Sequence, residues 1–162
     1  MRAARNRPVP ILLALLLFVG CTRPDGDYRF VSALTARFSG GSYEFQFMPA
    51  DSARCYATSL AARIVTSRIP GKTVSLDIRT TTPVGEILIE RLVLPLEDPD
   101  AARIVLGNGS VADYQWPWRT LQAAGQTQAP WHISITPTDP AQAEAFYGIG
   151  LSCEPIPWEK AN

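Results

Sequence analysis

The sequence predicts an all-β protein in which two antiparallel sheets pack face to face. Short apolar runs alternate with polar residues at period two, and turn residues separate these runs at regular spacing. Twelve of the 14 prolines lie beyond residue 20, where they suit sheet edges and corners. We expect a sandwich of about eight strands with one or two short helices, because each sheet must cover its apolar face. A partly closed β-barrel is the alternative.

The first half of the domain is expected to open with a β-hairpin. Residues 28–38 alternate as one strand, the Gly-rich residues 39–42 supply the turn, and residues 43–47 return. Residues 51–67 fit either a strand or a helix capped by Asp51. The strand is favoured because the segment lacks the acidic-to-basic pairs that stabilise helices.

Two clearer strands follow, and the second has an irregular pattern. Residues 74–79 alternate cleanly, whereas the apolar phase of residues 87–96 slips near Arg91. A bulge, or burial of both faces, would account for this slip.

The second half is expected to mix strands with short helices. In order, we expect strands at 103–106 and 110–116 around an Asn108-Gly109 turn, a helix at 117–124, a strand at 131–136, a helical turn at 139–146 and a last strand at 149–153.

The N-terminus has the pattern of a secretion signal. Three arginines precede an uncharged apolar run at residues 9–19, and polar residues begin after it. This run is too short to cross a bilayer, which takes about 20 apolar residues. Residues 1–20 are therefore expected to be a cleaved signal peptide.

The residues around the expected cleavage point resemble the lipobox of bacterial lipoproteins. In Leu17-Phe18-Val19-Gly20-Cys21 a small residue precedes the cysteine, although Phe18 departs from the usual aliphatic residue. The resemblance implies that Cys21 carries acyl chains such as palmitate and ties the protein to a membrane. An ordinary cleaved signal, with Cys21 as a free thiol, is the alternative. Residues 21–27 would then be a tether, residues 28–154 the domain and residues 155–162 a tail.

Charge and cysteine content limit the partners, bridges and metal sites that we expect. Without residues 1–20, 12 basic and 15 acidic residues remain, with no basic run, so nucleic acid is not an expected partner. Export to an oxidising compartment favours a disulfide between Cys55 and Cys153. Those two cysteines and the single His132 make a poor ligand set, so we expect no metal and no cofactor.

The residues suited to catalysis do not form a recognisable constellation. His132 lies on the polar phase of its strand, and the chain has no Gly-x-Ser-x-Gly turn. Glu86 and Glu90 could act as a carboxylate pair, but neighbours on one strand usually form a solvated face. Acidic turns at residues 25–27 and 97–100 could bind calcium, although neither has the spacing of a calcium loop.

An aromatic cluster is the best candidate for binding. Trp116-Pro117-Trp118, with Tyr114 nearby, could stack on sugar rings or dock a protein if the loop is exposed. The alternative is that the tryptophans plug and cover one end of the sandwich.

From about Tyr56 onward the chain resembles the GldH-type gliding-motility lipoproteins of Bacteroidetes. The resembling segments are Val74-Ser75-Leu76-Asp77-Ile78-Arg79, Leu92-Val93-Leu94-Pro95-Leu96, Leu106-Gly107-Asn108-Gly109, Trp131-His132-Ile133-Ser134-Ile135 and Gly148-Ile149-Gly150-Leu151. The resemblance implies a β-sandwich accessory lipoprotein without enzymatic activity.

Taken together, these patterns predict a lipid-anchored protein of the bacterial cell envelope. We expect a non-catalytic binding or accessory subunit with an envelope protein as partner, on the outer membrane in preference to the inner one. A carboxylate-dependent enzyme acting on envelope polymers or glycans is the alternative.

Overall fold

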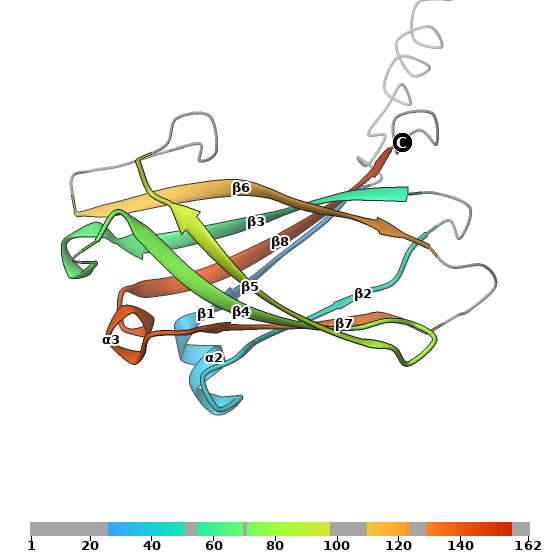
Figure 1. The fold of residues 1–162 in the computed structure, drawn as a ribbon, viewed down its shortest axis with the longest axis horizontal. Helices are drawn as coiled ribbons and strands as arrows, with labels where there is room; N and C mark the ends of the chain where they lie inside the picture. The colour runs from blue at the N-terminus through green and yellow to red at the C-terminus, as the bar shows by residue number, and fades with distance from the viewer. Residues whose placement is uncertain (1–25, 51–54, 70, 98–109, 124–128, 157–162) are drawn as a thin grey trace, which may run out of the picture.

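The computed structural model describes residues 26–50, 55–69, 71–97, 110–123 and 129–156 (Figure 1). Within these residues the chain forms eight strands and three short helical segments. The strands are β1 (Asp27–Ser32), β2 (Tyr43–Phe47), β3 (Cys55–Val65), β4 (Thr73–Thr81), β5 (Ile87–Pro95), β6 (Val111–Gln122), β7 (Trp131–Pro137) and β8 (Phe146–Ile156). The helices are α2 (Ala33–Phe38), the 3-10 turn η1 (Thr66–Arg68) and α3 (Pro140–Ala143).

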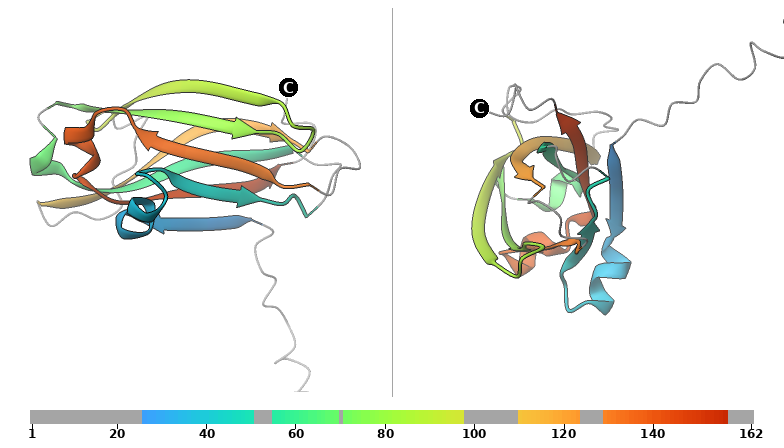
Figure 2. Two further views of the ribbon diagram at one scale, coloured as in Figure 1. Left: turned by 90° about the horizontal axis from the view of Figure 1, so that it is seen from below. Right: turned by 90° about the vertical axis from the view of Figure 1, so that its right-hand side faces the viewer.

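The strands form two four-stranded antiparallel sheets. One sheet has the order β1-β8-β3-β6 and the other the order β2-β7-β4-β5. The two sheets pack face to face, as the end-on view in Figure 2 shows, and the described strands do not close into a barrel. The predicted two-sheet β-sandwich is therefore confirmed.

Alternate residues of both sheets fill one continuous core. Buried positions repeat every second residue in β2, β4 and β7, as expected for strands with one face turned inward. The core residues with the least exposure include Trp116, Tyr56, Leu60, Ile64, Leu76, Ile78, Ile133, Ile135 and Ile149.

The predicted single strand at residues 28–38 is wrong, because it ends at Ser32 and a helix follows. Ser32 caps α2: its hydroxyl accepts a hydrogen bond from the backbone N–H of Thr35, at 3.2 Å. The apolar residues that suggested a strand are not buried together. Ala36 packs into the core, whereas Phe38 is 86% exposed. A local cap therefore prevails over a weak alternation.

The predicted first hairpin is also wrong. β1 pairs with β8 and β2 pairs with β7, so the two strands belong to different sheets. The helix between them carries the chain from one sheet to the other (Figure 1).

The strand interpretation of residues 51–67 is confirmed for β3, which lies at the centre of its sheet between β6 and β8.

The strand at 74–79 is confirmed as β4. The strand predicted at 87–96 is β5, and its register with β4 is continuous from Ile87 to Pro95, without a bulge. The phase slip arises because Ile87 and Ile89 face outward and remain exposed.

The helix predicted at 117–124 is wrong, because β6 continues to Gln122. Pro117 is tolerated at the place where the register with β3 shifts, between Ala57 and Ser59. The hydroxyl of Thr58 bridges this irregularity: it donates to the carbonyl of Arg119 at 2.6 Å.

The remaining expectations concern the C-terminal half. The predicted strand at 131–136 is β7, and the helical turn is the shorter α3, capped by Asp139. The last strand is longer than predicted and includes Pro155 and Ile156, which were assigned to the tail. The strand expected at 103–106, its Asn-Gly turn and Asp51 lie outside the described residues. None of the described helices is long and apolar enough to span a membrane.

Candidate functional site

The predicted aromatic cluster lies in β6 and not on a loop. Trp116 is only 2% exposed, and its indole Nε1 donates to the carbonyl of Pro95 on β5, at 2.9 Å. Tyr114 is also buried and stacks on Trp116, with ring centroids 5.4 Å apart. Trp118 is partly buried. The structure therefore supports the plugging role for the cluster, because two of its three rings lie in the core.

Glu86 and Glu90 do not form a carboxylate pair facing solvent. Glu86 is exposed in the turn before β5. Glu90 lies opposite Ile78 and therefore on the inward phase of the β5 edge strand. Its Oε1 accepts from Trp118 Nε1 at 3.2 Å and lies 3.1 Å from Arg119 Nη1. Glu90 thus links the two sheets at this edge.

The predicted disulfide is not formed, and the strand register explains why. Cys55 and Cys153 are both free and buried. Cys55 pairs with Ile156, whereas Cys153 pairs with Thr58 on the same strand. The cysteines are thus three residues apart along the ladder, about 10 Å, and on opposite faces of the sheet. A disulfide requires Cα atoms about 4.4–6.8 Å apart.

Other predicted positions do not form a site within the described residues. His132 is exposed on the outer face of β7, opposite Gln46 and Thr81. No group of three potential metal ligands occurs in the part of the chain that the structure describes. Cys21, Asp25, Asp98 and Asp100 lie outside that part.

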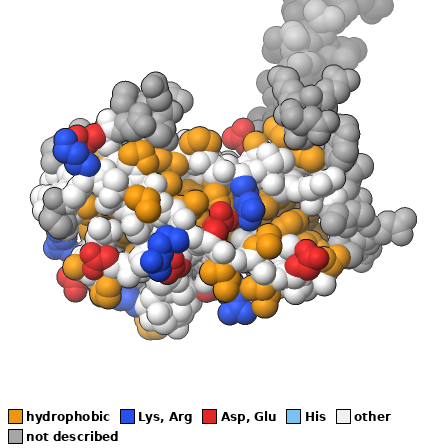
Figure 3. Space-filling model, in the orientation of Figure 1, with side chains coloured by type: hydrophobic (Ala, Val, Ile, Leu, Met, Phe, Trp, Pro, Cys, Tyr) orange, Lys and Arg blue, Asp and Glu red, His pale blue; other side chains and the backbone are white. Residues whose placement is uncertain are grey.

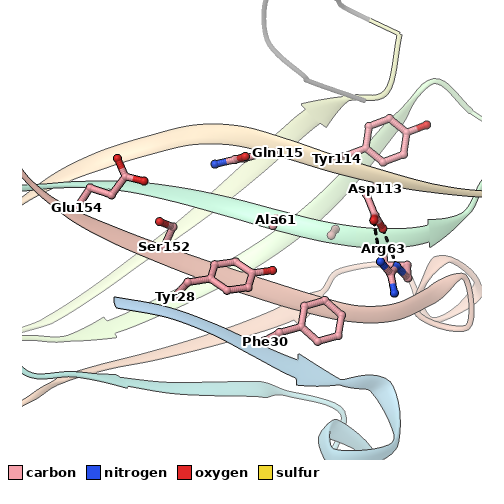
Figure 4. Close-up of a pocket in the computed structure, with 10 residues that line it drawn as sticks. Tyr28, Phe30, Ala61, Arg63, Asp113, Tyr114, Gln115, Ser152 and Glu154 are labelled. Atoms are coloured by element: carbon pink, nitrogen blue, oxygen red, sulfur yellow. Dashed lines mark hydrogen bonds and ion pairs between the residues drawn. The ribbon is translucent and has the colours of Figure 1, made fainter. Parts of the chain in front are cut away.

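The structure shows instead a groove on the outer face of the β1-β8-β3-β6 sheet. Two aromatic side chains of β1, Tyr28 and Phe30, lie across β8 above Gly150 and Gly148 (Figure 4). A Cβ atom at Gly150 would lie 2.7 Å from the Tyr28 hydroxyl, and one at Gly148 would collide with the Phe30 ring. The glycines therefore allow both rings to rest on the sheet.

The rings form an apolar platform that remains accessible. Tyr28 is 59% exposed and Phe30 is 45% exposed. Beside them the floor of the groove is made of small residues, Ala61 on β3 and Ser152 on β8. Small side chains on the floor of the groove allow a ligand to approach the backbone closely.

Polar side chains border the platform on the β6 side. Arg63 donates from Nε and Nη2 to the two carboxylate oxygens of Asp113, at 2.6 and 2.7 Å. These bonds lower the pKa of Asp113, so it is ionised at neutral pH. Gln115 donates from Nε2 to the Ser59 hydroxyl at 2.9 Å, which fixes its amide on the same face.

The groove has the size of a ligand site, about 510 Å³. It runs along the strands, with Glu154 at one end and the Arg63–Asp113 pair at the other (Figure 4). Its residues are Tyr28, Phe30, Ala61, Ala62, Arg63, Asp113, Tyr114, Gln115, Ser152 and Glu154.

Sequence reasoning missed this groove because its residues come from four strands whose pairing the sequence does not reveal. The alternation in residues 28–38 assigned Tyr28 and Phe30 to an inward face. One signal could have indicated otherwise: Gly148, Gly150 and Ser152 repeat at period two in the last strand, which marks a face with no side chains to fill it.

Comparison with known proteins adds no relative. No family model matches this chain, and neither the curated proteins nor the solved structures give a match.

Proposed function

We propose that this chain is a lipid-anchored, non-catalytic binding module of the bacterial cell envelope, and that it holds its ligand in the outer-face groove. The single observation that carries the binding role is the groove itself. It combines two exposed aromatic rings, a floor of small residues and a fixed polar border. Such a mixture of an apolar surface with a few oriented polar groups is typical of ligand sites.

The positions of the acidic groups support binding over catalysis. Asp113 lies opposite Arg63 on β3, whereas Glu154 lies opposite Ala57, which is six residues away from Arg63 along the same strand. At the spacing of a β-strand this places the two backbones about 20 Å apart along the sheet. Carboxylate-pair hydrolysis needs about 5–10 Å between the groups. Asp113 is also a poor general acid, because its hydrogen bonds lower its pKa.

The membrane anchor rests on the sequence around Cys21. In the organism that encodes the protein, Cys21→Ser should prevent acylation and move the protein from the membrane fraction to the soluble fraction. Cys55→Ser is the matched control and should leave the protein on the membrane. Incorporation of labelled palmitate into the Cys21→Ser protein, or none into the parent chain, contradicts the anchor.

The groove is tested with the soluble Cys21→Ser chain and isolated envelopes. Binding in a pull-down should fall at least about tenfold, or ~1.4 kcal/mol, when Tyr28→Ala and Phe30→Ala are combined. The control is Tyr147→Ala, an exposed tyrosine of β8 that does not line the groove. Equal binding of the two variants rejects the groove as the binding surface.

The accessory role in gliding motility remains a prediction from the resemblance alone. If it holds, a strain that lacks the protein should lose surface spreading, and restoring the chain should recover it. Recovery by the Tyr28→Ala/Phe30→Ala variant would separate that role from the groove.

A further inference from the structure

We propose that the ligand of the groove is a linear, uncharged glycan. This inference rests on the proposed function, since it names the ligand class of the same groove. It follows from three properties of the groove, which are its two exposed aromatic rings, the kind of polar groups at its border and its charge.

The aromatic platform matches the flat faces of sugar rings. Tyr28 and Phe30 lie against glycine positions and expose their rings side by side along the groove (Figure 4). The C–H faces of pyranose rings stack on such aromatic surfaces, while their hydroxyls point outward to polar partners. From Arg63 to Ala57, the residue opposite Glu154, the groove extends about 20 Å along β3, which gives room for several sugar rings.

The polar border can both donate and accept hydrogen bonds, as sugar hydroxyls require. The guanidinium of Arg63 has five N–H donors, of which the two bonds to Asp113 use only part. The carboxylate of Asp113 has lone pairs to accept from a hydroxyl. Because the two hydrogen bonds hold both side chains in place, the pair can bind two neighbouring hydroxyls with little further loss of side-chain entropy.

The charge of the groove favours an uncharged ligand. Arg63 is neutralised by Asp113, and Glu154 adds a negative charge at the other end. A phosphate, a uronic acid or nucleic acid would meet no unpaired cation among the residues that line the groove.

The position on the sheet face argues against a peptide strand. Peptides commonly add to a sheet edge, where they pair with free backbone groups. The floor of this groove is formed by β8 and β3, each paired on both sides within its sheet. Recognition must therefore use side chains, as it does for glycans.

The first test uses treated envelopes from the host and the soluble Cys21→Ser chain. One sample is digested with proteinase, which is then inactivated, and another is oxidised with periodate, which cleaves vicinal diols and is then quenched. Binding should survive the proteinase and be lost after periodate. Loss with proteinase and survival after periodate would overturn the glycan while keeping the groove as a binding surface. No binding to untreated envelopes would reject the proposed function itself.

The second test measures binding of named glycans by calorimetry. Cellohexaose and maltohexaose, whose internal residues carry the vicinal diols that periodate cleaves, are the uncharged probes, and hexagalacturonic acid is the charged one. At least one uncharged probe should bind, and its affinity should fall about tenfold or more, ~1.4 kcal/mol, in Ala61→Gln, which fills the floor. Tyr147→Ala should leave the affinity unchanged. Preference for the charged probe, no binding of either uncharged probe, or equal affinity in Ala61→Gln overturns the proposal.

A groove variant that binds nothing is informative only if it is folded. Gln115→Leu provides this check, because it removes the amide from the polar border and replaces it with a side chain of similar size. It should reduce glycan affinity while the urea midpoint stays that of the parent chain. Unchanged affinity in Gln115→Leu, in a chain that binds a probe, overturns the role assigned to the polar border.

Discussion

At the scale of single residues, strand register determines the chemistry that the cysteines can perform. Cys55 and Cys153 lie on the adjacent strands β3 and β8. They are offset by three residues and point to opposite faces of the sheet, which keeps their sulfur atoms apart. Burial raises the pKa of the Cys153 thiol to about 12, with a smaller contribution from the carboxylate of Asp27. Cys153 is thus a neutral, unreactive thiol at neutral pH.

This state predicts the outcome of thiol titration. In the Cys21→Ser chain, unfolded in denaturant without reductant, both remaining cysteines should react with a thiol reagent. In the folded chain at pH 8, Cys153 should resist alkylation because the attacking thiolate is absent. Mass spectrometry of the alkylated peptides gives the measurement. A peptide that links Cys55 to Cys153 before reduction would contradict the register.

The Arg63–Asp113 and Arg91–Asp77 ion pairs predict how stability changes with pH. Hydrogen bonds from these arginines lower the folded-state pKa values of Asp113 and Asp77 below the unfolded value of about 3.9. Their contribution is therefore present above about pH 4 and is lost as the pH falls through the lower folded pKa values.

Urea titrations between pH 6 and pH 2 test this prediction. Stability should fall on acidification, and Asp113→Asn should reduce the slope below pH 4 because one of the titrating groups is gone. Gln115→Leu, which removes no ionisable group and lies outside both pairs, is the control and should keep the parent slope. The same slope in Asp113→Asn and the parent chain would exclude a role for this pair.

At the scale of elements, the sequence predicts those strands best whose two faces differ clearly. The bounds of β4 and β7 follow from period-two alternation because their inward residues are apolar and their outward residues polar. Alternation fails where packing sets the outcome. Alternation assigned residues 33–38 to a strand although Ser32 caps a helix there. It also could not indicate that β6 continues beyond Pro117, where the Thr58 hydroxyl donates to the carbonyl of Arg119.

In β5, too, the apolar pattern of the sequence does not reveal which residues are buried. Its outward residues Ile87, Ile89 and Val93 are exposed, while Glu90 takes an inward position at the edge. Figure 3 shows exposed hydrophobic side chains among charged ones on the face of the molecule that it draws. An inward charge on an edge strand is one way in which natural sheets avoid pairing with other sheets. Hydrophobicity alone therefore suggested a bulge or burial of both faces, whereas β5 is a regular strand whose outward apolar residues stay exposed.

The contact between β1 and β8 predicts the effect of adding a single methyl group. Gly148→Ala would place its Cβ against the Phe30 ring and 2.6 Å from the backbone carbonyl oxygen of Val31, which cannot move freely. We expect a loss of about 1–3 kcal/mol in the free energy of unfolding, as for other overpacked sites. Gly150→Ala should cost less, because its closest neighbour is the far end of the Tyr28 side chain. Urea unfolding of both variants measures the difference, and an equal or larger cost for Gly150→Ala would contradict this explanation.

At the scale of the whole molecule, the sandwich is joined where the edge strands β5 and β6 meet. Trp116 crosses from one sheet to the other and donates to the carbonyl of Pro95, while Glu90 receives Trp118 and Arg119. The same strand, β6, contributes Asp113 and Gln115 to the groove on its outer face. The inner face of β6 thus joins the sheets, and its outer face borders the candidate site.

This arrangement predicts that the two tryptophans contribute unequally to stability. Trp116→Phe removes the hydrogen bond to the part-buried carbonyl of Pro95, which costs about 0.5–1.5 kcal/mol before any cavity left by the smaller ring is counted. Trp118→Phe should cost less, because Trp118 is only partly buried and Glu90 keeps its ion pair with Arg119. Urea midpoints of the two variants give the comparison, and glycan affinity in Trp116→Phe reports whether the groove stays intact. A larger loss in Trp118→Phe would show that the sheets are joined mainly through Glu90 and not through the buried ring of Trp116.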